Sequence, residues 1–500
     1  MATVLIIGGG VAGLSAGIYA RMNGYRAIVC ERHAVAGGNL TGWKRGNYVV
    51  DNCIHWLTGT NPATPAYRIW EDLGALGDGV DVAQTDTLYT CEHNGKRLSL
   101  HRNLNVLERD MLALSPADEP EIRSLIKAVK AVQGLLGIAG DNHDEKHLSV
   151  GALPLLFKYH RLSTEELSKR FAHPLLQRFT VCFLGKYFTS IALLVVFATF
   201  CGRNGGIPVG GSPAMAKRMA ERFVTLGGEL RLKKEALRIR LQNGKATSVL
   251  FADGEEIQAD YVVATPDPKV IFGKLLPVTM PEPLKKQYAD KRMLRFSAYH
   301  CAFACDTVDL PFQGDFIYEL PRKSQCALKT KYLILREFTH EKSFAPKGKT
   351  VIQSLTFTSE KDCREWIALR KNKTAYAQKK QELAEKVLQE IYEKFPCLSG
   401  KLKLLDVWTP ATYERYTGAE IGSFMSFVLP KGKLPLRTPC QITGAKNVIL
   451  ATQWQQPPGG LPTAAALGKH AVEQIARLEH QAEKAPLLQT LLRRTRRKQA

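Results

Sequence analysis

Apolar runs and a helical period alternate at the start of the chain, in the order strand, helix, strand. Residues 4–7 are all apolar, as in a strand buried on both faces, and residues 11–24 have the pattern of a helix. Residues 27–30 form a second apolar run. This alternation predicts a parallel α/β sheet whose first strand leads directly into a helix.

Three glycines lie in the predicted turn between the first strand and the helix. Gly8 permits the tight turn, Gly10 lets the backbone approach a pyrophosphate, and Gly13 lets helix and strand pack closely. Glu31 follows about 20 residues later, where a carboxylate accepts hydrogen bonds from ribose hydroxyls. These residues, with the phosphate-binding helix N-terminus, predict a site for an adenosine diphosphate moiety.

Gly37 and Gly38 extend this motif beyond the residues that a nicotinamide site needs. A second close approach of the backbone indicates a longer ligand, and we expect FAD. The sequence contains no second Gly-x-Gly-x-x-Gly motif, which a separate NADPH-binding domain would carry. We therefore expect electrons to enter or leave through a quinone, oxygen, another flavin or a transiently bound donor.

Residues 31–40 resemble the FAD-dependent amine oxidase and phytoene desaturase superfamily, which continues from the ribose acid through an arginine to a double glycine. In this sequence the arginine is Arg32, and Asn39 and Leu40 follow the double glycine. The resemblance covers nearly the whole chain. It implies a flavin enzyme of the phytoene desaturase, carotenoid isomerase and retinol saturase group.

Residues 46–59 are similar to the strand that such enzymes run past the flavin ring. The order of His55, an aromatic, an aliphatic and a glycine is closest to the retinol saturase branch, although Cys53 stands where the family usually has glycine. His55 is the candidate catalytic residue, because an imidazole near the ring could transfer a proton or orient the substrate. A histidine hydrogen-bonded to backbone in a packed strand is the alternative.

Residues 205–213 resemble the family's turn into a long helix, with Ser212 as its N-cap and Pro213 as its first residue. We expect that helix to end at Gly227-Gly228.

Alternating runs around residues 230–232, 237–241 and 249–251 predict a small antiparallel meander with Asn-Gly and Asp-Gly turns. Residues 259–268 resemble the strand that returns to the nucleotide-binding sheet.

Residues 450–462 resemble the segment that closes the flavin site in this family. Thr452 and Trp454 replace family glycines, and Gln456 replaces a histidine. These changes imply either a reshaped ring pocket or a lower flavin affinity. Residues 406–418 are similar to a segment that borders the substrate site, so Tyr416 and Trp454 are candidates for pocket walls.

The resemblance assigns FAD contacts to both ends and the middle of the chain, with Leu237 offering its backbone to adenine. The residues are Gly8, Gly10, Val11, Ala12, Gly13, Glu31, Arg32, Gly37, Gly38, Asn39, Leu40, His55, Leu237, Thr452, Gly460 and Leu461.

The fold class implied is α/β: a discontinuous FAD-binding Rossmann-like domain with an inserted α+β substrate-binding domain. Five hundred residues with 45% hydrophobic content can bury cores of this size. We expect the FAD-binding domain to comprise residues 1–80, 205–275 and 440–485. The substrate-binding region is expected at residues 81–204 and 276–439, and a basic tail at 486–500.

Residues 191–200 are almost continuously hydrophobic but too few to span a bilayer. They predict either a buried core helix or the wall of a tunnel for a long apolar substrate, and periodicity does not decide between them.

The net charge of +22 favours an anionic partner, either nucleic acid or a membrane surface. No nucleic-acid-binding motif is present, so a peripheral contact with anionic lipid is the better interpretation. The tail, with leucines followed by arginines, could lie on such a surface, or be a frayed terminus. No basic leader precedes the first strand, so we expect a cytoplasmic protein.

Eleven dispersed cysteines do not suggest a disulfide framework. Cys301 and Cys305, the closest pair, lack the partners of a zinc site, and no metal is expected.

The function expected from the resemblance is FAD-dependent oxidation or reduction of a carbon-carbon bond in a lipophilic isoprenoid or polyene, by desaturation, saturation or isomerisation. One alternative is amine oxidase-like oxidation of C-N bonds. Another is a lipid-binding carrier of the same fold, as in the Rab GDP-dissociation inhibitors.

Overall fold

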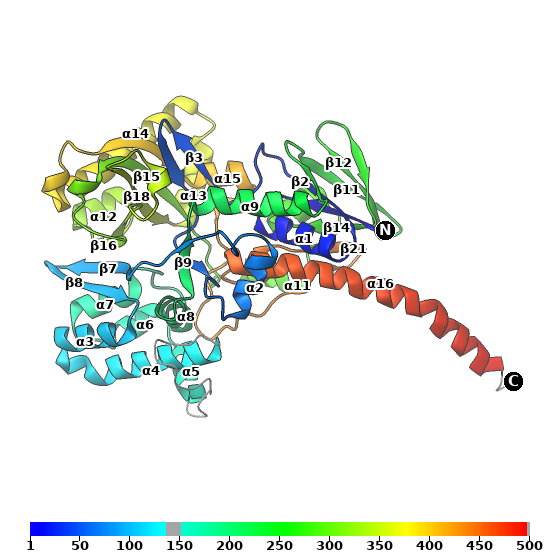
Figure 1. The fold of residues 1–500 in the computed structure, drawn as a ribbon, viewed down its shortest axis with the longest axis horizontal. Helices are drawn as coiled ribbons and strands as arrows, with labels where there is room; N and C mark the ends of the chain where they lie inside the picture. The colour runs from blue at the N-terminus through cyan, green and yellow to red at the C-terminus, as the bar shows by residue number, and fades with distance from the viewer. Residues whose placement is uncertain (137–151, 498–500) are drawn as a thin grey trace.

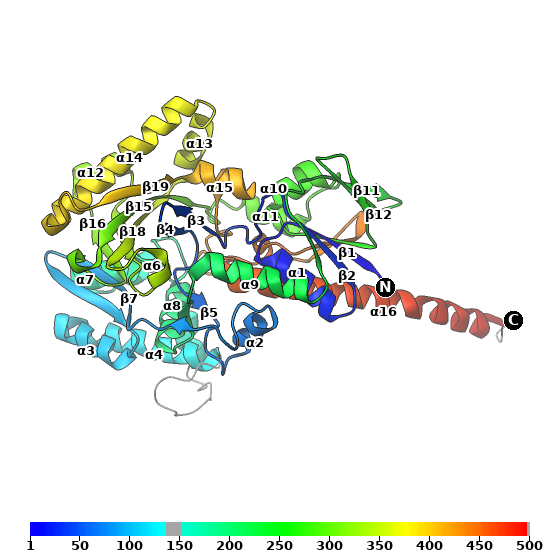
Figure 2. The same cartoon turned by 45° about the horizontal axis from the view of Figure 1, so that its top comes forward.

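The computed structural model describes the backbone of residues 1–136 and 152–497, and the side chains up to residue 480 except that of residue 152. The chain forms three lobes that meet at the centre of the molecule (Figure 1, Figure 2). One lobe holds a six-stranded sheet, a second holds a seven-stranded sheet, and the third is mainly helical.

The six-stranded sheet combines segments that are far apart in the sequence. Its order is β10-β2-β1-β14-β21-β20, and only β20 and β21 are antiparallel. The strands are β1 (Thr3–Ile7), β2 (Arg26–Cys30), β10 (Glu229–Arg231), β14 (Tyr261–Ala264), β20 (Gln441–Ile442) and β21 (Ala445–Leu450). In β1, Val4 and Ile6 pack on one face while Leu5 and Ile7 pack on the other, so the strand is buried on both sides. The predicted α/β class with a Rossmann-like sheet is confirmed.

Three helices cover one face of this sheet: α1 (Val11–Met22), α9 (Gly211–Thr225) and α16 (Leu461–Arg497). Helices α1 and α16 cross closely at Gly468, where a Cβ would lie only 2.3 Å from the carbonyl oxygen of Ala12. The absence of a side chain at Gly468 therefore permits the crossing. At this crossing the Ser15 hydroxyl donates to the carbonyl of Ala465 at 2.7 Å. Helix α16 then extends away from the body (Figure 1). The predicted basic tail lies outside the residues whose side chains are described.

The N-terminus of α9 differs from the prediction that Ser212 caps it and Pro213 begins it. The helix begins at Gly211 after Gly210, and both glycines have positive φ. The carboxylate of Asp51, at the end of strand β4 (Tyr48–Asp51), accepts from the Ser212 backbone N–H at 2.7 Å and from its hydroxyl at 2.6 Å. A side chain distant in sequence therefore caps the helix. Its other end agrees with expectation, since α9 stops just before Gly227 at φ 79°.

The antiparallel meander lies on the other face of the sheet and consists of β11 (Ala236–Gln242), β12 (Lys245–Phe251) and β13 (Glu256–Gln258). The prediction that residues 230–232 belong to it is wrong. Leu230 and Arg231 belong to β10, which pairs in parallel with β2 at the edge of the six-stranded sheet.

The seven-stranded sheet has the order β19-β15-β18-β17-β16-β7-β8 and is antiparallel except between β16 and β7. Its strands are β7 (Thr87–His93), β8 (Lys96–His101), β15 (Ser297–Asp306), β16 (Asp315–Glu319), β17 (Tyr332–Glu337), β18 (Lys349–Thr358) and β19 (Lys403–Trp408). Helices on this lobe are α12 (Arg322–Leu328), α13 (Glu360–Leu369), α14 (Lys373–Lys394) and α15 (Pro410–Thr417).

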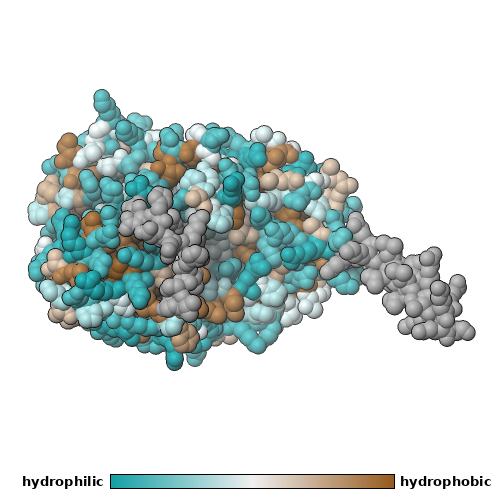
Figure 3. Space-filling model, turned by 60° about the horizontal axis from the view of Figure 1, so that its bottom comes forward, coloured by the Kyte–Doolittle hydropathy of each residue, from teal (hydrophilic) through white to brown (hydrophobic). Residues whose placement is uncertain are grey.

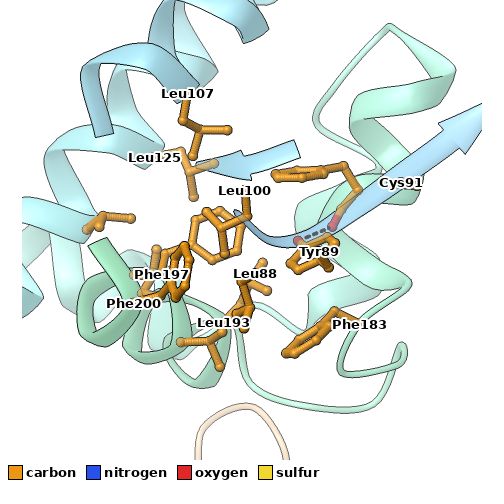
Figure 4. Close-up of a cluster of buried hydrophobic side chains, with 14 of the residues drawn as sticks. Leu88, Tyr89, Cys91, Leu100, Leu107, Leu125, Phe183, Leu193, Phe197 and Phe200 are labelled. Carbon is orange, nitrogen blue, oxygen red and sulfur yellow. Dashed lines mark hydrogen bonds between the residues drawn. The ribbon is translucent and has the colours of Figure 1, made fainter. Parts of the chain in front are cut away.

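The helical lobe packs against β7 and β8 through a large hydrophobic cluster (Figure 4). Its helices are α3 (Leu104–Leu114), α4 (Glu119–Leu135), α5 (Ala152–His160), α6 (Thr164–Ser168), α7 (Pro174–Val181) and α8 (Ser190–Cys201). Leu193, Phe197 and Phe200 of α8 lie in this cluster and are fully buried. The Tyr89 hydroxyl donates to the carbonyl of Phe179 at 2.8 Å and joins sheet to helix.

Short elements connect the lobes around the centre. They are β3 (Gly42–Arg45), β5 (Leu57–Thr58), α2 (Pro65–Asp72), β6 (Val82–Ala83), β9 (Gly205–Pro208), α10 (Pro268–Val270) and α11 (Glu282–Ala289). Among the described helices, none combines the length and the hydropathy needed to cross a bilayer.

Candidate active site

A cavity of about 1170 Å³ lies where the three lobes meet. At one end it is lined by the glycine turn after β1 and by Glu31, and at the other by helices α5 and α8. One continuous space therefore joins the predicted nucleotide site to the substrate region. Such a size and shape suit a cofactor and an apolar ligand together.

The nucleotide end is a groove between two stretches of glycine backbone. The Gly37 N–H donates to the carbonyl of Gly9 at 2.8 Å, and Gly37 and Gly38 have φ values of 127° and 60°. A Cβ at Gly37 would lie 2.3 Å from the Leu40 carbonyl oxygen, whereas a Cβ at Gly10 would meet nothing closer than 3.8 Å and would occupy the groove itself. A groove in which a single methyl group would block the approach to the backbone fits a pyrophosphate bound by backbone N–H groups.

Glu31 is fixed at the end of this groove. Its carboxylate accepts from the N–H of Gly9 at 2.7 Å and from the N–H of His33 at 2.9 Å. Tyr416 stacks on the His33 ring at 4.0 Å, and Glu31 and Tyr416 both line the cavity. The carboxylate keeps accepting capacity for ribose hydroxyls because each oxygen has more than one lone pair.

Two of the predicted FAD contacts do not reach the cavity. A Cβ at Gly13 would lie 1.8 Å from the Gly8 carbonyl oxygen, so Gly13 serves the packing of α1 on the turn. Leu237 is 47% exposed, and Lys234, Glu235 and Ala236 line the cavity in its place. The predicted contact between the Leu237 backbone and adenine stays a prediction.

The structure brings the remaining predicted contacts to one cavity. They are Gly8, Gly10, Val11, Ala12, Glu31, Arg32, Gly37, Gly38, Asn39, Leu40, His55, Thr452, Gly460 and Leu461. Their contact with FAD stays a prediction.

Two of the positions that depart from the family pattern, Thr452 and Trp454, lie at the cavity. Thr452 turns inward and its N–H donates to the Gln455 side chain at 3.0 Å. Trp454 is buried against Tyr288 and Phe427 but still borders the cavity. On the opposite wall, the Asn52 side-chain oxygen is buried with no hydrogen-bond partner among the described residues. An unpartnered acceptor here fits a ligand that carries N–H or O–H groups.

His55 lies between the main cavity and a small void behind it. Burial, followed by the nearby Arg336 guanidinium and His300, holds the pKa of His55 well below its ordinary value. The imidazole is therefore neutral at physiological pH, and it can accept or donate a hydrogen bond without carrying charge.

His300 on β15 forms a buried relay beside His55. The Trp408 indole N–H donates to the Tyr413 hydroxyl at 3.1 Å, and that hydroxyl lies 3.0 Å from Nε2 of His300. An imidazole N–H of His300 donates to the backbone of Ser354, so the other nitrogen of the neutral ring accepts the Tyr413 proton. The His300 ring also stacks on Trp408 at 4.5 Å, and burial lowers the pKa of His300 to about 3.

Arg336 and Asp315 form a buried ion pair at the same end of the cavity. They are paired residues on adjacent strands β17 and β16, and Nε of Arg336 donates to Oδ1 of Asp315 at 2.6 Å. A second contact joins the other guanidinium nitrogen to Oδ2, so the pair is bidentate. Arg336 also reaches the carbonyl of Ile54 at 3.4 Å.

We expect His300→Gln to destabilise the protein less at low pH than at neutral pH. The folded state keeps His300 neutral, while the unfolded chain binds a proton below its ordinary pKa, so wild-type stability contributed by this group falls as pH drops. The wild type should exceed His300→Gln in free energy of unfolding by about 1.4 kcal/mol less at about pH 5.5 than at about pH 7.5. Urea unfolding of both proteins at the two pH values measures this difference. A difference that does not change with pH would contradict a neutral His300 in the folded protein.

Helix α8 has one face in the core and another at the cavity, while its role as the wall of a tunnel for a long apolar substrate stays a prediction. Ile191, Ala192 and Val195 line the cavity. Leu193 and Phe197 point into the hydrophobic cluster of the helical lobe. The helix is apolar on every side because each side meets either core or cavity.

The sequence matches the family model described as flavin containing amine oxidoreductase over residues 11–476. The chain belongs to this family. FAD is therefore its cofactor, and the chain is an FAD-dependent oxidoreductase.

Proteins similar in sequence to this chain include carotenoid enzymes. The chain is 24% identical to a chloroplastic prolycopene isomerase of Daucus carota, covering 98% of this chain and 82% of that protein. It is also 24% identical to a phytoene dehydrogenase of Streptomyces griseus, covering 94% of each.

Solved structures share the fold at lower identity. An oxidoreductase from Methanosarcina mazei matches with a TM-score of 0.63 and 16% identity, covering 94% of this chain and 100% of that one. Putrescine oxidase bound to putrescine matches with a TM-score of 0.61 and 14% identity, covering 95% and 99%.

Sequence reasoning missed the polar group formed by His300, Tyr413, Asp315 and Arg336. No motif marks it, since its members come from three strands and a helix. Tyr413 lies within the segment 406–418 that resembled a substrate border, which was the one available signal.

All eleven cysteines are free thiols, and burial raises the pKa of Cys301 and of Cys305. Among the described residues, no group of three acidic, histidine or cysteine side chains is placed to hold a metal ion.

Proposed function

We propose that this flavoenzyme acts on a carbon-carbon bond of a lipophilic isoprenoid or polyene. The observation that carries the proposal is the continuity of the cavity, which runs from the glycine groove to a long apolar wall. That wall is formed by α8 together with aromatic rings from the sheets and loops, among them Phe183, Phe357 and Phe424. The carotenoid-acting relatives support the same substrate class.

The residues of the chain have three tasks in this proposal. The apolar wall binds the polyene and excludes water, the glycine groove and Glu31 fix the cofactor, and His55 orients the reacting part of the substrate. FAD, when bound, supplies the redox chemistry. Because His55 is held neutral, it acts as a hydrogen-bond partner rather than as a charged acid.

Oxidation of amines is the second candidate, since putrescine oxidase shares the fold. The part of the cavity lined by His55, His300 and Asp315, which we call its inner end, is poorly suited to an ammonium group. Among the described residues of that end, the carboxylate is Asp315, and it is already paired with Arg336. A non-catalytic lipid carrier is the third candidate, which the glycine groove and Glu31 disfavour.

Purification followed by cofactor and lipid analysis tests these candidates together. We expect a yellow protein with near-stoichiometric FAD, and turnover of a polyene with a quinone or oxygen as electron partner. Peroxide release with amines and none with polyenes would instead support amine oxidation. A colourless protein that binds polyenes but cannot be reconstituted with FAD would support the non-catalytic lipid carrier.

We further propose that the cavity opens toward an anionic membrane surface. Leu135, Leu153 and Phe157 of α4 and α5 line its outer part and are more than half exposed, and so is Leu434 on the facing loop. The face of the molecule seen in Figure 3 carries hydrophobic patches among polar surface. An apolar rim on a chain of net charge +22 fits a lipid surface that supplies an apolar substrate.

The double variant Leu434→Ser and Leu436→Ser is expected to weaken binding to phosphatidylglycerol vesicles at least tenfold. These leucines are 62% and 70% exposed, and each would lose part of the ~1.5–3 kcal/mol that full burial of a leucine provides. Val308→Ser is the matched control, because Val308 is 93% exposed on the lobe of the seven-stranded sheet. Vesicle sedimentation in which both variants bind like the wild type would refute the proposed docking face.

A further inference from the structure

Within the helical lobe, the cavity is open at its outer part and closed farther in. Leu135 at the end of α4 and Phe157 of α5 line the outer part and are more than half exposed. Val132, about one turn earlier in α4, also lines the cavity but is only 2% exposed. A long apolar chain that enters through the outer part must therefore stop where the cavity closes.

Four side chains form the closed part, which we call the end wall: Trp56, Val132, Phe183 and Val196. The rings of Trp56 and Phe183 pack together with their centroids 5.3 Å apart. Val196 lies one turn beyond Ala192 on the face of α8 that lines the cavity. Phe183 and Val196 are 8% and 7% exposed, so little of either is open to anything but the cavity.

A second ring stands behind Phe183. Tyr89 stacks on it with centroids 4.7 Å apart and is fully buried, without lining the cavity (Figure 4). The Tyr89 hydroxyl donates to the carbonyl of Phe179 at 2.8 Å, which fixes this ring against α7. Phe183 is thus a single side chain between the cavity and a fixed ring. Its truncation would deepen the cavity, because the ring behind it is not free to fill the space.

We propose that Phe183 is the stop against which the terminus of the isoprenoid chain rests. This inference rests on the proposed function and adds a specificity-determining residue to it. A chain whose terminus is held at Phe183 has every other bond at a set distance from that point. The end wall therefore selects which carbon-carbon bond is placed at the flavin end of the cavity.

A pair of probes that differ only at their termini tests the inference on the FAD-loaded protein. One is an open-chain polyene, and the other is the same chain with a phenyl group on each terminus. Both are presented in one detergent, and the polyene that coelutes with the protein is measured by its own absorbance. We expect the wild type to bind the phenyl-terminated chain at least tenfold more weakly, because a close-packed wall leaves no room for a second ring.

Phe183→Ala should bind the phenyl-terminated chain as well as the open chain, since it leaves a space of the size of the ring that the probe adds. Phe183→Leu should recover part of this binding and covers a failure of Phe183→Ala to fold. Phe157→Ala makes the same change at the outer part of the cavity, and the discrimination between the two probes should persist.

Turnover gives a second measurement that a merely structural role of Phe183 would not change. With the open chain, Phe183→Ala should react at a bond about one isoprene unit farther from the buried terminus than the wild type does, because the chain enters deeper by about the size of a phenyl ring. Mass spectrometry of the products locates the altered bond.

Each outcome has a definite consequence. Equal binding of both probes to the wild type overturns the inference but leaves a polyene enzyme, and so does continued rejection of the phenyl-terminated chain by both Phe183 variants. Binding of that chain restored by Phe157→Ala alone would place the stop at the outer part and overturn the inference too. If neither probe binds to a protein that contains FAD, the proposed substrate class fails and the inference fails with it.

Discussion

Gly10→Ala is expected to yield a folded protein that has lost its FAD. A Cβ at this position meets no atom of the protein closer than 3.8 Å, and the backbone of Gly10 has φ −74°, which alanine adopts freely. The methyl group would instead fill the groove between Gly10 and Gly38. Flavin content should fall at least tenfold, since a pyrophosphate cannot approach the backbone past a methyl group. Absorbance of the purified protein measures the loss.

Comparison with Gly13→Ala distinguishes a blocked FAD groove from a destabilised fold. There a Cβ would lie 1.8 Å from the Gly8 carbonyl oxygen, so the first turn itself must move. We expect this variant to lose stability as well as flavin, whereas apo Gly10→Ala should unfold within about 1 kcal/mol of the apo wild type. A yellow Gly10→Ala protein with wild-type FAD content would show that the cofactor does not pass through this groove.

Asp315→Asn is expected to destabilise the protein by about 3–5 kcal/mol, because it leaves the buried guanidinium of Arg336 without its counter-charge. The side chains of Asp315 and Arg336 are only 5% and 10% exposed, so water cannot replace the lost partner. Urea unfolding at neutral pH gives the change in the free energy of unfolding.

The double variant Asp315→Leu and Arg336→Met provides the control for this pair. Removing both charges takes away the desolvation cost as well as the attraction, so most of the lost stability should return. If the double variant is as unstable as Asp315→Asn, the pair stabilises the fold by more than charge neutralisation.

The nucleotide half of the site could be predicted from the sequence because it is local. Gly8, Gly10 and Glu31 belong to one strand, helix, strand unit, so their spacing along the chain fixes their spacing in space. The start of the strand that holds Leu237 lies at the cavity as expected, although Lys234, Glu235 and Ala236 line it and Leu237 does not.

The substrate half could not be predicted because it is assembled across the fold. Asp315 and Arg336 meet only through the register of β16 and β17, and His300 meets Tyr413 through the packing of α15 on the sheet. The cap of α9 is missed for the same reason, since Asp51 lies far from Ser212 along the chain. The apolar run of α8 left both roles open because nearly every position in it is hydrophobic, so periodicity could not assign a face to each role.

The crossing of α1 and α16 has a consequence for the order of events during synthesis. The glycine groove is made by residues 8–38, but the wall that closes it includes Gly460 and Leu461, which are translated much later. Strand β14 also needs β21 as its neighbour, so the sheet is incomplete until the C-terminal part has been translated. We therefore expect flavin to bind only after this wall has been translated, and chains that end before residue 450 should never acquire colour.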